Sequence, residues 1–542
     1  MDIISNMRRA AGRNLADINE LDARIEREES RPESRSAAGL SVLSWVLVVL
    51  ALAVPAAIAL AIQLSAYPNH DVAWVLWGSR EMLHGAQYGR DIIEPNPPLA
   101  WYLSMPTTAL AMALGVPLDR TFTIFITLAG VLSAASLIWL RPRRLSIGQS
   151  AVIAMVAVTT LLTMTGREFG QREPLMMILV LPYLALAGRR FDGASVPGPR
   201  ATIAIGVIAG LGFALKPYFL AVPLLIEVVL KLWGKKPLAL FRGENLSAAA
   251  VILAYGLWVI LSEKPYLYEI IPLVREIYWS FNYPVLGISV RLTPLILGVA
   301  PLAYLFYKQK DGLGLVLTTS FVGFIFSYLI QQKGYDYHLN PARMLPLLLA
   351  VRLMVDPGFH RIYRWAALAL TFAFFVLWMD RSIRWWSAAR PGGSLYRQIE
   401  QINGSIARHA SGGRYIVITI RTYPNFPAGI YAPARYASRT NAQWFLPAVA
   451  QLREKGQPSA SVERHAREFV MHDLQTKPDL VLLDTNAKGH TLGPRDFDIL
   501  KFYQEDPAFR QIWRPYREVE PIGQFRQFVR VPDALPPAEH KA

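Results

Sequence analysis

Residues 40–64 read Leu40-Ser-Val-Leu-Ser-Trp-Val-Leu-Val-Val-Leu-Ala-Leu-Ala-Val-Pro-Ala-Ala-Ile-Ala-Leu-Ala-Ile-Gln-Leu64, a run without a single charged residue. An apolar run of this length crosses a lipid bilayer as an α-helix. The polar segment that follows, Ser65-Ala-Tyr-Pro-Asn-His-Asp71, places Asp71 within about two helical turns of the membrane surface. The sequence then stays rich in His, Arg, Asp and Glu as far as Glu94-Pro-Asn-Pro-Pro-Leu99. An acid in this position indicates chemistry on a lipid-borne substrate.

The composition of the whole chain fits a membrane protein. Of its 542 residues, 53% are hydrophobic and only 18% are charged, and the mean hydropathy is +0.26. Soluble globular chains carry about 25% charged residues, so the chain is expected to be an integral membrane protein. The formal net charge is +16, but the basic residues are scattered among short loops, which argues against nucleic acid as a partner. The chain has no cysteine, which excludes disulfides, thiolate catalysis and Cys-ligated metals.

Further apolar segments predict about eleven membrane spans in all. After the first, they lie near Thr121–Leu140, Ala151–Met164, Leu175–Ala187, Ala201–Ala214, Tyr218–Leu232, Ala248–Leu261, Leu292–Phe306, Leu315–Ile330, Met344–Met354 and Trp365–Trp378. Several are shorter than the roughly 20 residues that a span requires. Pro98–Gly115 is apolar but interrupted by prolines, and we interpret it as interfacial or re-entrant helices.

The charges of the loops predict how the chain is oriented. With Pro98–Gly115 not crossing, the loops rich in Arg and Lys fall on one side, together with the N-terminus. The positive-inside rule then predicts a multi-pass protein with a cytoplasmic N-terminus. The loop 65–119, which holds Asp71, and the C-terminus are predicted to lie on the opposite, outer side of the membrane.

The domain organisation follows from these patterns. Residues 1–38 are polar, and an amphipathic helix on the cytoplasmic face and a solvated tail fit them equally well. Residues 39–385 form the predicted membrane domain, and residues 390–542 have the composition of a soluble domain. In that domain we expect strands at Tyr415–Ile420, Leu480–Asp484 and Arg526–Val531, and helices at Ala442–Glu454, Ser461–Thr476 and Pro494–Asp506. This predicts a small α/β domain, and no Gly-rich phosphate loop accompanies its strands, which argues against an ATP-driven pump.

The loops on the same side as Asp71 carry ionisable residues close to predicted span ends. These residues are Arg167, Arg172, Lys216, Lys333, His338 and Arg343. A single Lys or Arg at a helix end usually extends its charge to the interface. The concentration of six such residues on one side instead predicts a polar cavity. Aromatic residues of the soluble domain, such as Tyr423 and Trp444, are compatible with stacking on sugars or with packing in the core.

The residues after Asp71 resemble the GT-C superfamily of membrane glycosyltransferases, and more narrowly family 39, which includes protein mannosyltransferases and aminoarabinose transferases. The pattern reads Asp71-Val-Ala-Trp74, then Gly85-Ala-Gln-Tyr88-Gly-Arg-Asp91, then Glu94-Pro-Asn-Pro-Pro-Leu99-Ala-Trp-Tyr102. The resemblance implies a polytopic helical fold with a C-terminal extracytoplasmic α/β domain. It also implies an enzyme that moves a sugar from a polyprenyl-phosphate donor to a glycan, lipid or protein acceptor. Many relatives have a Lys before the Pro-Pro pair, where this chain has Asn96.

The resemblance and the residue chemistry together predict roles for the site. Asp71 matches the first-loop acid of the family and is the predicted base, with Glu94 or Asp91 as a second acid. Since the leaving group is a phosphate, cations can stabilise it without protonation. The candidates for binding this phosphate are Lys216, Arg172, Lys333 and Arg343. The candidates for other substrate contacts are Tyr88, Asn96, Arg167, Glu173 and His338.

Other interpretations remain open from the sequence. Asp71 could simply cap the helix that follows it. A transporter or flippase for a lipid-linked sugar also needs a polar cavity, and a non-catalytic assembly subunit would use the C-terminal domain for binding. No His-x-x-x-His or paired-acid signature is present. We therefore predict no metal and no other cofactor, although some GT-C relatives use a divalent cation.

Overall fold

The computed structural model describes residues 42–232, 241–485 and 497–531. By its internal contacts the chain divides between Leu50 and Ala51. The predicted N-terminal segment 1–38 lies outside the described residues, as does the beginning of the helix expected at Pro494–Asp506.

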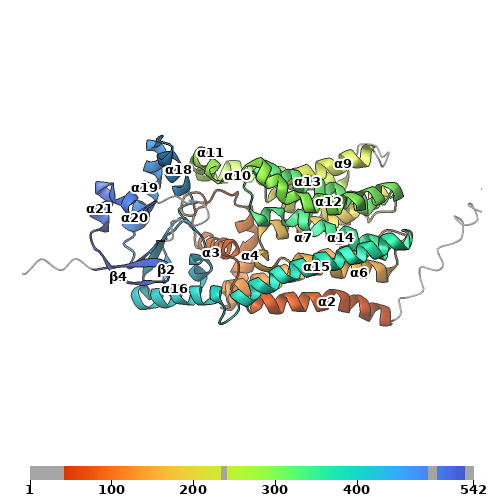
Figure 1. Cartoon of the computed structure of the whole chain (residues 1–542), viewed down its shortest axis with the longest axis horizontal. Coiled ribbons are helices and arrows are strands. Elements are labelled where there is room, and N and C mark those ends of the chain that lie inside the picture. Colours follow the sequence, from red (N-terminus) through yellow and green to blue (C-terminus); the bar gives the residue numbers. More distant parts are fainter. Residues whose placement is uncertain (1–41, 233–240, 486–496, 532–542) are drawn as a thin grey trace, which may run out of the picture. The chain divides into compact units, whose positions relative to one another are not determined.

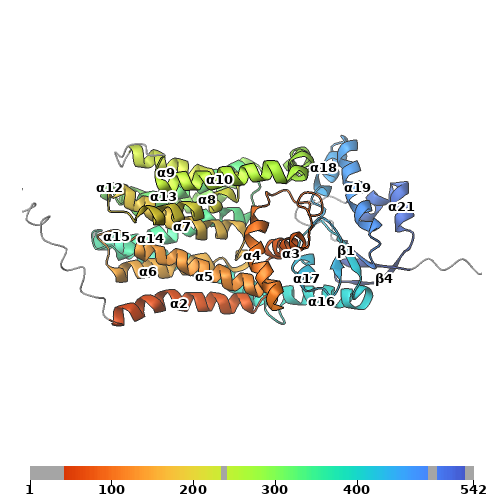
Figure 2. The ribbon, with the colours of Figure 1, turned by 180° about the vertical axis from the view of Figure 1, so that it is seen from behind.

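The first two thirds of the chain are helical. The helix α2 (Val42–Leu64) is followed by α3 (His70–Leu83) and α4 (Leu99–Leu114). A series of mostly long helices comes next: α5 (Leu118–Trp139), α6 (Ile147–Val158), α7 (Arg172–Phe191), α8 (Pro199–Ala214), α9 (Ala221–Leu232), α10 (Gly243–Ser262), α11 (Ile271–Ile277), α12 (Val285–Gln309), α13 (Gly312–Gln331), α14 (Asn340–Val355) and α15 (Arg361–Ala389). From α5 onward, the longer of these helices lie side by side in a bundle (Figures 1 and 2).

Seven helices of the described residues are long and apolar enough to cross a membrane. They are Val42–Leu64, Leu118–Trp139, Arg172–Phe191, Gly243–Ser262, Val285–Gln309, Gly312–Gln331 and the segment Arg361–Ala410. This confirms a polytopic helical membrane protein, whereas the predicted number of about eleven spans is not confirmed. The difference arises from short helices such as α9, with 12 residues, and α14, with 16. Roughly 20 residues are needed to span the hydrocarbon layer.

The helix α7 lies at the centre of the bundle. In the most apolar 18-residue stretch of α7, 78% of the residues are buried inside the protein, whereas 11% are buried in the corresponding stretch of α10. Its sequence also matches the helix dipole, with Glu173 in the first turn and Arg189 and Arg190 in the last. Because α7 is central, its middle is buried on all sides, while Arg172, Arg189 and Arg190 at its ends stay partly exposed.

The C-terminal part of the chain is an α/β domain. After α16 (Ser394–Ala410) come β1 (Arg414–Ile418), α17 (Asn425–Tyr431), β2 (Arg435–Tyr436), α18 (Leu446–Glu454), α19 (Ala460–Gln475), β3 (Leu480–Asp484), α20 (Ile499–Gln504), α21 (Pro507–Trp513), β4 (Tyr516–Ile522) and β5 (Phe525–Arg530). The strands form one sheet in the order β2-β1-β3-β5-β4. β1 is parallel to β2 and β3, and β5 is antiparallel to β3 and β4. The three expected strands are therefore confirmed.

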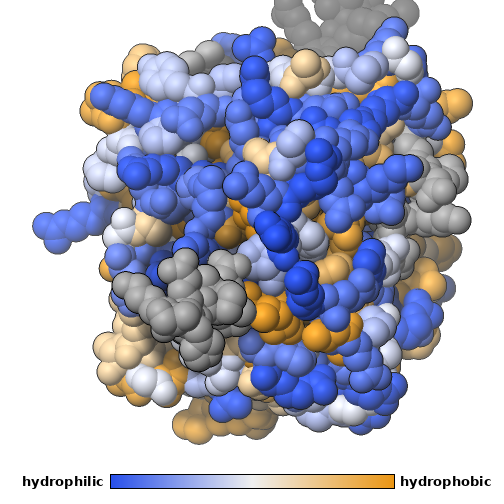
Figure 3. All heavy atoms as spheres, turned by 90° about the vertical axis from the view of Figure 1, so that its left-hand side faces the viewer, coloured by the Kyte–Doolittle hydropathy of each residue, from blue (hydrophilic) through white to orange (hydrophobic). Residues whose placement is uncertain are grey.

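The helices α3 and α4 lie between the bundle and the α/β domain (Figures 1 and 2). On α3, Trp74 and Trp77 stack with their ring centroids 4.8 Å apart. Phe426 of α17 packs edge-on against them at 5.1 and 5.9 Å. The backbone N–H of Ile93 also donates to the carbonyl of Arg439, at 2.8 Å. The outward face of the α/β domain is predominantly hydrophilic (Figure 3), as expected for a domain that contacts water.

Candidate active site

A cavity of about 920 Å³ lies where the bundle, the loops around α3 and the α/β domain meet. Its lining includes Asp71, Glu94 and Arg172 from the membrane part and Arg421 and Trp444 from the α/β domain. This volume is at the upper end of the range for ligand pockets. The structure therefore brings segments that are far apart in the sequence to one polar chamber.

Local structure fixes the position of Asp71. Asn69 is the N-cap of α3, and its side chain accepts a hydrogen bond from the backbone N–H of Asp71, at 2.7 Å. The Gln171 amide donates to Asn69 at 2.8 Å and to the Asp71 carboxylate at 3.1 Å. The first turn of a helix favours a negative charge. Asp71 is thus held as a partly exposed carboxylate at the cavity wall, and capping of α3 is already performed by Asn69.

His70 links Asp71 to an arginine. Nδ1 of His70 lies 2.9 Å from the Arg167 guanidinium, and Nε2 lies 3.6 Å from the Asp71 carboxylate. Burial lowers the pKa of His70 to about 4, an effect that Asp71 opposes and Arg167 reinforces. His70 is therefore neutral at pH 7. Since the guanidinium can only donate, Nδ1 accepts and the ring proton is on Nε2, facing Asp71.

Glu94 is the second carboxylate of the cavity. It is buried, and it accepts hydrogen bonds from the Trp74 indole N–H at 3.0 Å and from the side-chain amide of Asn96. Burial raises the pKa of Glu94, while Arg172 and the bond from Asn96 oppose the shift. Asn96, at the position where many relatives have Lys, thus holds Glu94. Its backbone carbonyl accepts from the Tyr88 hydroxyl at 2.5 Å.

The loop between α3 and α4 depends on one glycine. Gly89 has a φ of +81°, and an added Cβ would lie 2.4 Å from the backbone nitrogen of Tyr266. A side chain would therefore force the loop away from its neighbour. This explains why a glycine follows Tyr88 in the motif that precedes Glu94.

Five arginines line the cavity, namely Arg167, Arg172, Arg291, Arg381 and Arg421. Arg381 lies 3.9 Å from Glu168 and 3.6 Å from Asp336, and Arg291 donates to the Gly334 carbonyl at 2.8 Å. Within the described residues, Arg172 and Arg421 form no ion pair, and neither guanidinium donates a hydrogen bond. These two cations are consequently available to an anionic ligand.

Of the predicted site residues, the structure places Asp71, Glu94, Arg172, Asn96 and Arg167 at the cavity. The other predicted residues do not line it: Asp91, Lys216, Lys333, Arg343, Tyr88, Glu173 and His338. Each of these has partners inside the protein.

The partners of the residues outside the cavity indicate structural contacts. Asp91 accepts from the backbone of Gln87 at 2.8 Å. Lys216 forms a buried ion pair with Glu173 at 2.5 Å, with His338 3.8 Å from the same carboxylate.

Lys333 and Arg343 contact two loops that line the cavity. Lys333 donates to the Tyr278 carbonyl at 2.8 Å, and burial lowers the pKa of Lys333 to about 8. Arg343 donates to the backbone of Asp336 at 3.0 Å. Their predicted roles at the phosphate remain predictions.

Several cavity residues were not identified from the sequence. They are Glu168, Arg291, Asp336, Arg381 and Arg421, with Tyr278, Tyr335 and Tyr337. Glu168, Asp336, Tyr335 and Tyr337 lie close in sequence to the predicted residues Arg167, Lys333 and Arg343. Arg421 follows a predicted strand directly, which was a usable signal. Among the described residues, no group of three or more His, Asp or Glu is placed to hold a metal ion.

No protein-family model matches the sequence, and no curated protein matches it. Solved structures match the fold. ArnT from Cupriavidus metallidurans, bound to undecaprenyl phosphate, has a TM-score of 0.53 at 13% identity; the match covers 91% of this chain and 99% of ArnT.

Two further structures have lower scores. The oligosaccharyltransferase AglB from Archaeoglobus fulgidus has a TM-score of 0.43 at 13% identity, covering 92% of this chain and 76% of AglB. The arabinofuranosyltransferase AftD from Mycobacteria has 0.39 at 16%, covering 88% and 39%. The similarity to ArnT confirms the GT-C fold that the residues around Asp71 implied.

Proposed function

We propose that the chain is an inverting glycosyltransferase of the EC 2.4 class that uses a polyprenyl-phosphate-linked sugar as donor. The acceptor is a lipid, a polysaccharide or a protein, and the reaction takes place on the periplasmic face of a bacterial inner membrane. One observation carries this proposal: a single cavity holds the Asp71 carboxylate, Glu94 and the unpaired Arg172. The GT-C fold and the family-39-like motif after Asp71 support it.

The residues of the cavity can perform the reaction in one step. Asp71 takes the proton of an acceptor hydroxyl as its oxygen attacks the anomeric carbon of the sugar. The new carbon–oxygen bond forms as the bond from that carbon to the phosphate oxygen breaks. Polyprenyl phosphate leaves with the bonding electrons, and Arg172 stabilises the developing charge. A single attack from the opposite face inverts the anomeric configuration.

The surroundings of Asp71 suit this role. His70 is neutral and presents an N–H, so it stabilises the carboxylate without adding a charge. The Gln171 amide fixes the orientation of the carboxylate. Glu94, held by Trp74 and Asn96, is placed to orient a sugar hydroxyl. A base that is oriented before substrate binds needs little reorganisation during the reaction.

The positions of the basic residues support the proposed orientation. Arg189 and Arg190 end α7, and Arg242 precedes α10. All three lie at the end of the bundle remote from the cavity, which the positive-inside rule assigns to the cytoplasm. Asp71 and the α/β domain then face the periplasm.

The test is Asp71→Asn in the full-length protein in lipid nanodiscs, combined with complementation of a deletion strain. We expect the envelope product to fall by about 10²- to 10⁴-fold, the range for loss of a general base. Binding of undecaprenyl phosphate should be unchanged, since Asn keeps the shape of the side chain. Glu81→Gln is the matched control, because Glu81 lies on the same helix and outside the cavity. Full product formation by Asp71→Asn would refute the proposal.

A further inference from the structure

The topology of the C-terminal sheet defines a crevice at one of its edges. β1 lies between β2 and β3, and both neighbours are parallel to it. The chain leaves β1 toward β2, whereas it leaves β3 in the opposite direction, toward β5 and β4. In open α/β sheets, ligands bind at the carboxyl ends of two adjacent strands whose connections diverge in this way. Here that point lies between β1 and β3.

The residues at this edge line the cavity. Arg421, Thr422 and Tyr423 follow β1, and Asn441 and Trp444 follow β2. Gln524 belongs to the turn between β4 and β5, and its carbonyl accepts from the backbone N–H of Thr485 at 2.9 Å, just after β3. The cavity is therefore closed on one side by the carboxyl edge of the sheet.

Contacts within the edge hold it in place. The Thr419 hydroxyl donates to the Asp484 carboxylate at 2.8 Å and so joins the ends of β1 and β3. The backbone N–H of Gln443 donates to the Thr419 carbonyl at 2.6 Å, which ties the segment after β2 to β1. An edge fixed in this way can present a side chain to a ligand without a large loss of conformational entropy.

The guanidinium of Arg421, at this edge, has no hydrogen-bond or ion-pair partner among the described residues. Its Nε is buried and has no hydrogen-bond partner, and no carboxylate of the described residues forms an ion pair with it. Two arginines of the domain show the usual alternative: Arg453 lies 2.7 Å from Glu463, and Arg526 forms a bidentate pair with Glu518. A partly buried guanidinium without an anion is costly, and a bound phosphate or carboxylate would remove this cost.

We propose that the carboxyl edge of this sheet is the acceptor half of the site and that Arg421 binds an anionic group, phosphate or carboxylate, of the acceptor. This inference rests on the proposed function. Trp444 and Tyr423 offer ring faces to a sugar, and Asn441 and Gln524 offer amides. The donor phosphate is anchored by its lipid to the membrane helices, where Arg172 begins α7. Two anions then bind on opposite walls of one cavity.

The first experiment separates acceptor from donor. Arg421→Gln and Arg421→Lys are compared with Arg517→Gln, a matched control on exposed β4 outside the cavity. In the complemented deletion strain, Arg421→Gln should lower the envelope product by about tenfold or more, and Arg421→Lys should restore part of it. Affinity for undecaprenyl phosphate in nanodiscs should be the same in all variants. Reduced affinity in Arg421→Gln would assign Arg421 to the donor and overturn the inference.

The second experiment measures anion binding directly. The full-length protein is saturated with undecaprenyl phosphate and titrated with glucose 1-phosphate, glucuronate or neutral glucose, with the thermal midpoint as readout. Wild type should be stabilised more by one or both charged sugars than by glucose, and Arg421→Gln should lose this difference. Which charged sugar acts distinguishes phosphate from carboxylate. Equal effects of all three sugars on wild type would refute the inference.

The two proposals fail in different ways. If Asp71→Asn abolishes the product while Arg421→Gln leaves it unchanged, the glycosyltransferase stands and the acceptor site does not. If wild type neither binds undecaprenyl phosphate nor requires Asp71, the proposed function itself is wrong. A melting temperature of Arg421→Gln equal to that of wild type excludes misfolding as the cause of a lost product.

Discussion

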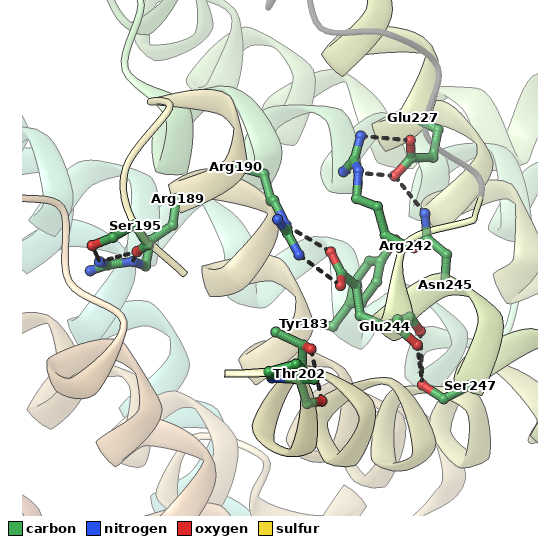
Figure 4. A network of polar contacts seen from close by, with 12 residues as sticks. Tyr183, Arg189, Arg190, Ser195, Thr202, Glu227, Arg242, Glu244, Asn245 and Ser247 are labelled. Carbon is green, nitrogen blue, oxygen red and sulfur yellow. Dashed lines mark hydrogen bonds and ion pairs between the residues drawn. The ribbon is translucent and has the colours of Figure 1, made fainter. Parts of the chain in front are cut away.

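The arginines at the two ends of α7 differ in whether a carboxylate forms an ion pair with them. Arg172 at the beginning and Arg190 near the end are separated by about 27 Å at 1.5 Å per residue. Arg190 forms a bidentate pair with Glu244, with distances of 2.9 and 3.0 Å (Figure 4). Arg172 has no ion pair with any of the described residues and lines the cavity. Arg190, remote from the cavity, is neutralised by a carboxylate, whereas Arg172, which we propose stabilises the donor phosphate, has no ion-pair partner among the described residues.

The remote end of the bundle repeats this pairing. Arg242 contacts Glu227 at 3.3 and 3.4 Å, and Asn245 donates to the same carboxylate at 3.0 Å (Figure 4). These contacts join the middle of α9 to the beginning of α10. Buried charges need such partners because desolvation of an unpaired ion is expensive. A partly buried arginine without a carboxylate partner is therefore informative, and variants at both ends of α7 test this distinction.

The largest effect is expected at Lys216. It lies at the same end of the bundle as the cavity, but it forms a buried ion pair within the protein. Its side chain and that of Glu173 are 5% and 1% exposed. Lys216→Met should leave Glu173 buried without its partner and destabilise the protein by about 3 kcal/mol or more. The double variant Lys216→Met/Glu173→Gln should recover most of this loss, measured by thermal unfolding in detergent.

The same pair of variants tests the predicted phosphate role of Lys216. If Lys216 is structural, undecaprenyl phosphate binding should return together with stability in the double variant. A double variant that is stable but unable to bind undecaprenyl phosphate would instead place Lys216 at the phosphate.

The next largest effect is expected at Arg172. Arg172→Gln should lower sugar transfer by about 10²- to 10³-fold, the usual loss when one group that stabilises transition-state charge is removed. The thermal midpoint should fall less than in Lys216→Met, because no ion pair within the described residues is broken and Arg172 interacts with the charges of Glu173 and Glu94 only at longer range. A large drop in the midpoint with transfer retained would contradict the distinction between the two ends of α7.

A smaller effect is expected at Glu244, on the remote end. Glu244→Gln should leave Arg190 without its carboxylate and destabilise the protein by roughly 2 kcal/mol. This loss of stability lies between the losses expected for a surface ion pair and for a buried one, because the Arg190 side chain is 28% exposed. Transfer per folded molecule should be unchanged. A loss of transfer at an unchanged thermal midpoint would show that this network communicates with the cavity.

Parts of this arrangement could be predicted from the sequence, and parts could not. The apolar runs predicted most of the helices, and β1, β3 and β5 followed from short buried patterns. Strand β4 was missed because Tyr516–Ile522 is mostly exposed and polar, and β2 because it has only two residues. Short runs of this kind carry no periodic signal.

The site shows the same limit. Asp71 and Glu94 could be located because they lie in one continuous motif. Arg381 and Arg421 were not located, although Arg421 directly follows a predicted strand, since only tertiary packing brings the end of α15 and the edge of the sheet to the same cavity. Likewise, the sequence could not tell that Lys216 is paired whereas Arg172 is not. Pairing depends on which carboxylate lies within about 4 Å, and that is a property of the fold.

The smallest effect is expected from Glu168, an acid within the cavity whose charge changes near neutral pH. Burial raises the pKa of Glu168 to about 7, and Asp71 adds to the shift while Arg167 opposes it. Since the unfolded value is near 4.5, this group favours the fold most below pH 4.5, and that contribution is lost as the pH rises through about 7. The same rise adds a negative charge to the cavity and weakens binding of an anionic lipid phosphate.

We therefore expect the dissociation constant of undecaprenyl phosphate to rise by about two- to fivefold between pH 6 and pH 8 in wild type, relative to Glu168→Gln. The phosphate of the ligand titrates in this range as well, but it does so equally with both proteins. The ratio of the two dissociation constants at each pH therefore isolates the carboxyl group. A constant ratio would mean that Glu168 keeps one charge state and that Arg381, 3.9 Å away, neutralises it as fully as the pairs at the remote end of the bundle.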